Sequence, residues 1–177
     1  APGDAARNPG YTASRSCPAG ATDVSEPRRS STTAAGASMS HVVSTFHILL
    51  VADPVGTARV SAILAPFGYR LHVVRDAYEA VQSIAEDPPE VVIISDALPG
   101  LEGFSLLRTL RTSRGTEELP VMFLASGAEQ EARAFQLGAE DVCGERTSDV
   151  ALRARVRVLL RMAAYRRRLG NEKRRLE

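Results

Sequence analysis

Short apolar runs recur five times between residues 47 and 144, and each is followed by a longer segment whose apolar residues recur at helical spacing. Continuous apolar runs of this kind are typical of strands that are buried on both faces of a sheet. The strands expected on this basis are residues 47–53, 70–75, 91–95, 120–126 and 140–144.

The segments between these runs carry the start and stop signals of helices. Gly68 and Gly138 stand where C-cap glycines are expected, and Pro88 with Pro89 stops the second helix. Ser148 or Asp149 suits the N-cap of the last and longest helix. The helices expected on this basis are residues 55–69, 77–87, 104–113, 128–139 and 148–169.

Five strands that alternate with five helices predict an α/β fold: a doubly wound, five-stranded parallel sheet with helices on both faces. Sheets of this type bind their ligands at the carboxyl ends of the strands. The residues expected at those ends are Ala52, Asp53, Ser95, Asp96, Ala125, Ser126, Gly144 and Glu145.

Composition distinguishes the two ends of the chain from its middle. Residues 1–45 are rich in Ala, Ser, Thr, Gly and Pro without apolar periodicity, so we expect a disordered, low-complexity leader. No apolar stretch approaches the roughly 20 residues of a membrane span. Cys17 and Cys143 lie in segments of very different character, so we expect no structural disulfide and a reducing, cytoplasmic location.

Charge separates the middle from the C-terminus. Residues 47–146 hold eight basic and fifteen acidic side chains, whereas residues 147–177 hold ten basic and three acidic ones. We expect residues 164–177 to form a basic helical extension or linker, which could contact nucleic acid or another polyanion, continue into an output domain, or end in solvent. Without a helix-turn-helix pattern, nucleic-acid binding is not favoured.

Several motifs together resemble the receiver domain of the two-component response-regulator family, over about residues 46–161, and the receiver-like domain is expected over residues 46–163. They are a strand ending near an acid ("LLVAD"), the turn and helix "LPGLEGFSLLRTLR", the strand "LPVMFLAS", and "LGAEDVCGE", which is similar to the family's "GADDYLTKP". The resemblance implies a flavodoxin-like sheet with strand order 2-1-3-4-5. It also implies a role in bacterial phosphorelay signal transduction, as a signalling module and not an enzyme.

A working receiver needs two adjacent acids after the first strand, an aspartate phosphoacceptor after the third, a Thr or Ser after the fourth and a Lys after the fifth. The acids and the acceptor hold a divalent metal, and the hydroxyl and the ammonium bind the oxygens of the phosphoryl group. This chain departs from the pattern at most positions. The corresponding residues are Ala52, Asp53, Ser95, Ala125 and Glu145.

Ser95 falls at the acceptor position by two independent counts. It lies four residues before Pro99, and a gapless count forward from "PPE" reaches the same residue. Asp96 and Ser126 each lie one position from where the family has its aspartate and hydroxyl, but a shift of one residue in a strand would turn the wrong side chains outward. The sequence therefore predicts a degenerate pseudo-receiver, with phosphorylation of Asp96 as the alternative.

The remaining expectations concern ligands and partners. Asp53 is the one candidate for a remnant metal ligand, although a capping role is favoured, so no cofactor is expected and Mg²⁺ belongs to the alternative only. We expect contacts with other signalling proteins or a fused output domain, and a homodimer through the fourth helix, fifth strand and fifth helix. The residues expected on that surface are Ala128, Arg133, Val142, Arg153, Arg157 and Arg161.

Overall fold

A computed structural model describes residues 46–176, apart from the side chains of Leu101 and Lys173. The leader expected over residues 1–45, including Cys17, lies outside the described residues. The five strands are β1 (His47–Val51), β2 (Arg70–Val74), β3 (Val91–Ser95), β4 (Val121–Ala125) and β5 (Asp141–Gly144). They form one parallel sheet in the order β2-β1-β3-β4-β5, which confirms the expected flavodoxin-like topology.

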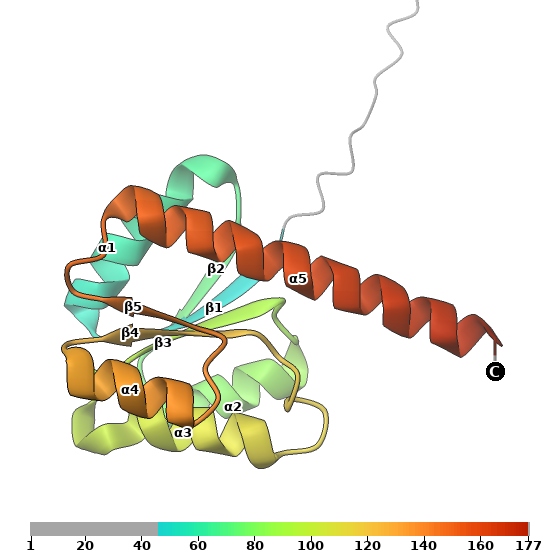
Figure 1. The fold of residues 1–177 in the computed structure, drawn as a ribbon, viewed down its shortest axis with the longest axis horizontal. Helices are drawn as coiled ribbons and strands as arrows, with labels where there is room; N and C mark the ends of the chain where they lie inside the picture. Colours follow the sequence, from blue (N-terminus) through green and yellow to red (C-terminus); the bar gives the residue numbers. More distant parts are fainter. Residues whose placement is uncertain (1–45, 177) are drawn as a thin grey trace, which may run out of the picture. The chain divides into compact units, whose positions relative to one another are not determined.

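Helices cover both faces of this sheet (Figure 1). They are α1 (Pro54–Leu64), α2 (Ala77–Glu86), α3 (Glu102–Thr112), α4 (Ala128–Gln136) and α5 (Asp149–Leu176), with short 3-10 turns at Ala65–Phe67 and Pro99–Leu101. In Figure 1, α1 and α5 lie on one face and α2, α3 and α4 on the other. The connections between strands therefore pass over both sides, as in other doubly wound sheets.

Alternate residues of each strand build two separate cores. Leu49 and Val51 pack with residues of α2 and α3, whereas Ile48 and Leu50 pack with residues of α1 and α5. Both sets are fully buried, which explains why the sequences of the inner strands β1, β3 and β4 are apolar at nearly every position and not at every second one. The same strand register brings the carboxyl ends of β1, β3, β4 and β5 to one edge of the sheet.

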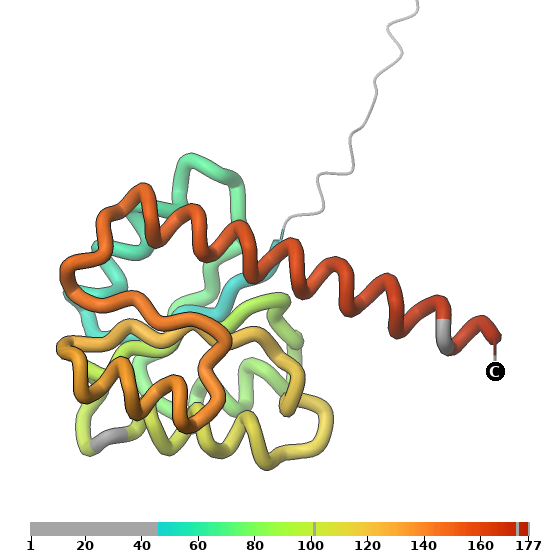
Figure 2. The backbone as a smooth tube through the Cα atoms, in the orientation of Figure 1, coloured from blue at the N-terminus to red at the C-terminus, as the bar shows by residue number. Residues whose placement is uncertain are grey.

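The last helix is longer than the sequence signals predicted. Its helix signals end at Leu169, but α5 continues through Gly170 to Leu176, which agrees with the helical form of the extension expected over residues 164–177. Its N-cap is Ser148, whose Oγ accepts a hydrogen bond from the Ala151 amide at 3.2 Å. A single glycine costs a helix only about 1 kcal/mol, and the Arg and Leu residues around it favour helix, so the segment lacks an effective stop. The backbone trace shows α5 extending beyond the rest of the domain (Figure 2).

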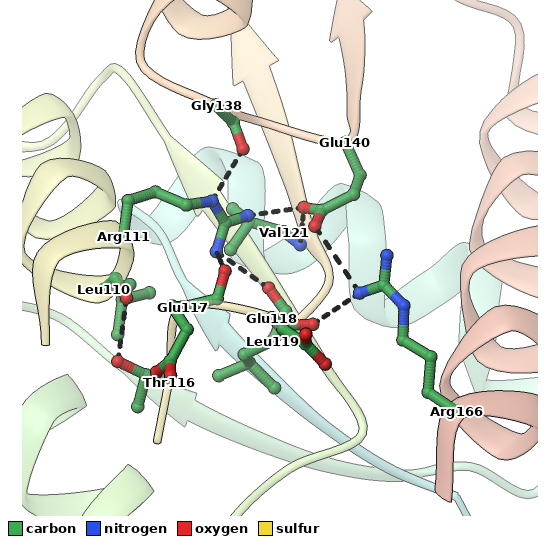
Figure 3. A network of polar contacts seen from close by, with 10 residues as sticks. All are labelled: Leu110, Arg111, Thr116, Glu117, Glu118, Leu119, Val121, Gly138, Glu140 and Arg166. Atoms are coloured by element: carbon green, nitrogen blue, oxygen red, sulfur yellow. Dashed lines mark hydrogen bonds and ion pairs between the residues drawn. The ribbon is translucent and has the colours of Figure 1, made fainter. Parts of the chain in front are cut away.

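Two ion-pair networks hold the middle of α5 against the domain. Arg166 donates to the Glu118 carbonyl oxygen and lies 3.9 Å from Glu140 Oε1. Glu140 in turn pairs with Arg111, and its Oε2 accepts from the Val121 amide at 2.7 Å (Figure 3). Arg167 pairs with Glu90 at 2.8 Å, on the loop that precedes β3.

Arg111 is the centre of the first network, since its guanidinium also donates to the carbonyl oxygens of Gly138 at 2.7 Å and Leu119 at 3.0 Å. Replacing Arg111 by Met is expected to lower the free energy of unfolding by about 2 kcal/mol, because Glu140 and two carbonyl groups lose their partner in a largely buried position. Urea unfolding measures this change. Exposed Arg108 on the same helix is the control, and its change to Met should alter stability by no more than about 0.5 kcal/mol.

Candidate functional site

A cleft lies at the carboxyl ends of the strands, where the sequence predicted the site. Its lining includes Asp53, Gly56, Arg59, Ser95, Asp96, Ala125, Ser126, Gly144 and Glu145. These residues come from the ends of β1, β3, β4 and β5 and from the first turns of α1. The register makes this meeting possible, since Ser95 of β3 pairs with Leu124 and Ala125 of β4 pairs with Gly144.

Ser95 is a buried residue with a satisfied side chain. Only 5% of it is exposed, and its Oγ accepts a hydrogen bond from the Ala97 amide at 3.1 Å. A Cβ atom added to Gly56 would lie 2.9 Å from Asp53 Oδ1 and 4.0 Å from Ser95 Oγ. Asp53 and Ser95 therefore approach the same point beside Gly56.

The carboxylate of Asp53 caps α1. Its Oδ2 accepts from the Val55 amide and its Oδ1 from the Gly56 amide, both at 3.2 Å. An aspartate at an N-cap satisfies amides that have no partner within the helix and is favoured by the helix dipole. This capping role is the one that the sequence favoured for Asp53.

Asp96 is directed to the neighbouring loop. Its Oδ2 accepts hydrogen bonds from the Ser126 amide at 2.7 Å and from Ser126 Oγ at 2.8 Å. The Asp96 amide also donates to the Leu124 carbonyl oxygen at 3.0 Å. Asp96 thus joins the loop after β3 to the loop after β4. The hydroxyl of Ser126, the residue that follows β4, is engaged in this contact.

Charge in the cleft is mainly negative. Asp53, Asp96 and Glu145 contribute carboxylates, and Arg59 is the guanidinium group among the lining residues. Arg59 is already engaged, since it donates to the Thr147 carbonyl oxygen and lies 3.5 Å from Asp149 Oδ1. Sequence reasoning missed Arg59, because an arginine in the middle of a helix carries no signal that it faces a cleft.

The divalent metal that the family resemblance implies does not fit these residues well. Ala52 supplies no ligand atom, and the oxygens of Asp53 and Ser95 already accept hydrogen bonds from backbone amides. A hard cation such as Mg²⁺ prefers several free oxygen ligands. Across residues 46–176, no three or more His, Cys, Asp or Glu side chains gather in an arrangement that could hold a metal ion.

Cys143, on β5, is a core residue. It is a free thiol with 2% of its surface exposed, and burial raises its pKa to about 11. A thiol with so high a pKa stays protonated at neutral pH and is a poor nucleophile. Cys143 therefore serves in packing and not in chemistry.

The residues expected on the interaction surface do not all share one face. Ala128 and Arg133 of α4 are exposed, with the Arg133 guanidinium 4.4 Å from the centre of the Phe104 ring. The expectation that Val142 lies on this surface is wrong, because strand alternation buries its side chain in the core beneath α2, α3 and α4. The expectation for Arg153 is also wrong, since its guanidinium lies 5.1 Å from the centre of the Phe67 ring, beside the turn that follows α1.

The rest of the expected surface belongs to α5. Arg157 and Arg161 are exposed there. Arg155 pairs with Asp141 of β5 and so marks the side of α5 that faces β5. The sequence could not distinguish these faces, because arginines occur on several sides of α5.

Fold and cleft together define a doubly wound α/β domain with its candidate site at the strand ends. Residues 48–157 match the family model of the response regulator receiver domain. This match covers more than half of the chain, and the chain belongs to the response regulator receiver domain family.

Curated relatives share only this part of their length with the chain. Response regulator PleD of Caulobacter vibrioides is 30% identical over 117 residues, which are 64% of this chain and 26% of PleD. The phosphate regulon transcriptional regulatory protein PhoB of Rhizobium meliloti is 36% identical over 98 residues, 54% of this chain and 43% of PhoB. The chain thus spans about a quarter of PleD and less than half of PhoB.

Solved receiver structures superpose on the same region. The receiver domain of sensor histidine kinase PA1611 from Pseudomonas aeruginosa, described with a magnesium ion in its active-site cleft, is 29% identical with a TM-score of 0.58. The alignment covers 67% of this chain and 98% of that one. The signal receiver domain of a histidine kinase from Syntrophus aciditrophicus is 28% identical with a TM-score of 0.60, covering 65% and 89% of the two chains.

Proposed function

We propose that this chain is a degenerate receiver that signals through protein contacts without being phosphorylated. The observation that carries the proposal is the position of Ser95 at the end of β3. Its hydroxyl is buried beside Asp53 and already bonded to the Ala97 amide. A serine hydroxyl there lacks the negative charge of the carboxylate that accepts the phosphoryl group in receivers, and its Oγ already accepts from the Ala97 amide.

Electrostatics supports the same proposal. Glu145 stands where the resemblance places a lysine, and it adds a third carboxylate to a cleft that already contains Asp53 and Asp96. A phosphoryl group carries negative charge and needs cationic or hydrogen-bonding partners, so this cleft repels it. Asp96 meanwhile accepts both hydrogen bonds from Ser126, which holds the loop after β4 near the cleft without any phosphoryl oxygen.

Acetyl phosphate with Mg²⁺ tests the proposal directly. We expect the intact mass of the protein to remain unchanged, and beryllofluoride with Mg²⁺ to leave its thermal unfolding unaltered, because the acceptor position holds Ser95 and the lysine position holds Glu145. Asp96→Asn is the paired variant. A stoichiometric phosphoryl adduct that disappears in Asp96→Asn would contradict the proposal and establish the conventional receiver.

The partners of such a domain would be other signalling proteins or an output domain on the same polypeptide. The limited coverage of PleD and PhoB supports the second possibility, since both extend well beyond the matched region. We also propose a cytoplasmic location and no catalytic activity of this domain itself. Among the helices of residues 46–176, none combines the length and the apolar character needed to cross a bilayer.

A further inference from the structure

The outer side of α5 carries a row of large apolar side chains that the domain does not cover. The exposed fractions are 52% for Val158, 38% for Met162, 63% for Tyr165, 49% for Leu169 and 89% for Leu176. These residues follow the length of α5, a helix that extends beyond the rest of the domain (Figure 1). We call these five residues the outer row.

The outer row is distinct from the face by which α5 packs on the sheet. That face consists of Leu152, Val156, Leu159 and Leu160, all buried in the core shared with α1. Farther along, Arg166 and Arg167 attach the helix to Glu140 and Glu90. With the packing face occupied, the outer row stays free to meet another molecule.

The spacing of the outer row suits a second helix. Its members follow one another at intervals of four, three, four and seven residues, which is the heptad pattern of helices that pair side by side. Val158, Arg161, Met162 and Tyr165 also line a shallow depression on the surface of α5. The helix of 28 residues thus presents an apolar seam from Val158 to Leu169, which is interrupted at Glu172 before Leu176.

Arginines flank this seam. Arg161, Arg168 and Arg175 repeat every seven residues beside the outer row, all three are exposed, and none forms an ion pair within the described part of the chain. Residues 161–176 hold seven basic side chains and one acidic one. If two copies of α5 paired, their basic flanks would face each other, and like charges at these positions disfavour pairing.

We propose that the outer row and its arginines dock an acidic amphipathic helix of a different protein. Such a helix would carry apolar residues at alternating intervals of three and four, with Asp or Glu beside them to meet Arg161, Arg168 and Arg175. The phosphates of a nucleic acid would pair with the arginines, but they would not cover the apolar side chains of the outer row. The inference names a partner for the proposed function but does not depend on the state of the cleft.

A designed peptide tests the inference on the full chain. The probe is a fluorescein-labelled helix of four heptads with Leu at the two core positions and Glu at the flanking positions, and its matched control has Lys in place of Glu. Fluorescence anisotropy should show saturable binding of the Glu peptide and none of the Lys peptide. Affinity should fall as salt is raised, because part of the attraction is between exposed charges.

Two pairs of variants assign the binding to this face. Met162→Gln with Leu169→Gln should weaken binding of the Glu peptide by about tenfold or more, because it removes two buried apolar contacts. Val81→Gln with Phe135→Gln is the matched control, since these two side chains are equally exposed on α2 and α4. Circular dichroism should show an unchanged fold for both pairs.

The charge is tested in the same way. Changing Arg161, Arg168 and Arg175 to Glu should abolish binding of the Glu peptide and allow binding of the Lys peptide. The matched control changes three other exposed arginines to Glu and should leave both results as in the parent chain. These control residues are Arg75, Arg108 and Arg114.

Three outcomes would overturn the inference. The Glu and Lys peptides could bind equally or not at all. Sedimentation could show that the chain alone is a dimer that Met162→Gln with Leu169→Gln dissociates, which would make a second copy the occupant. A DNA duplex could bind more tightly than the Glu peptide, with an affinity that Met162→Gln and Leu169→Gln leave unchanged. None of these outcomes affects the acetyl phosphate experiment, so the two proposals fail separately.

Discussion

A variant with Ser95→Asp, Ala125→Thr and Glu145→Lys is expected to take up one phosphoryl group from acetyl phosphate with Mg²⁺, whereas the parent chain takes up none. The three positions line one cleft, so the new side chains would converge on the same space. The change at Ser95 supplies a nucleophile, and the change at Glu145 replaces a repelling charge with an attracting one. Intact-mass spectrometry measures the gain.

Asp53 is the residue on which this result also depends. Mg²⁺ in phosphoryl-transfer sites is commonly bound by one or two carboxylates together with phosphate oxygens, and Asp53 would provide one of them beside the new carboxylate at Ser95. It must then share its oxygens with the amides of Val55 and Gly56, which it now caps. We therefore expect slower phosphorylation than in receivers that have both acids.

Two controls separate the chemistry from the fold. The isosteric variant Ser95→Asn, with the same changes at Ala125 and Glu145, should stay unmodified, because an amide is not a nucleophile for this reaction. Glu145→Lys alone should also stay unmodified. A triple variant that unfolds cooperatively like the parent chain but takes up no phosphoryl group would contradict the prediction. It would show that the residues at these three positions are not what prevents phosphorylation.

Gly103→Val is expected to lower the free energy of unfolding by about 3 kcal/mol, which is the largest effect that we expect from a single substitution. A Cβ atom on Gly103 would lie 2.5 Å from the Ser95 carbonyl oxygen and 3.3 Å from Ile94 Cγ2. Both neighbours belong to β3, which is buried in the middle of the sheet and cannot move aside. Urea unfolding monitored by circular dichroism gives the loss.

Gly170→Val is the matched control for this substitution. Gly170 also lies within a helix, but a Cβ atom there would have no neighbour within 4 Å. Valine has a higher helix propensity than glycine, so stability should be unchanged or slightly increased. Equal destabilisation by both substitutions would contradict the view that close packing of α3 on β3 requires glycine at position 103.

The sequence predicted the fold because its signals are local and agree with one another. Apolar runs such as Val91–Ser95 are too uniform for a half-exposed strand. Gly68 caps the turn that follows α1, and Pro88 comes just after the end of α2, as helix stop signals should. Counting from Pro99 also placed Ser95 at the strand end. No such local rule assigned a face to Val142 or showed where the last helix would end.

Local pattern thus determined which residues form strands, which form helices and which reach the carboxyl edge of the sheet. It could not show that Asp96 bonds to Ser126 or that Arg59 faces the cleft. Those relations join residues from separate elements and depend on distances that exist only after the sheet has assembled. Hydrophobic periodicity is a property of neighbours along the chain, whereas hydrogen bonding and charge at the site are properties of neighbours in space.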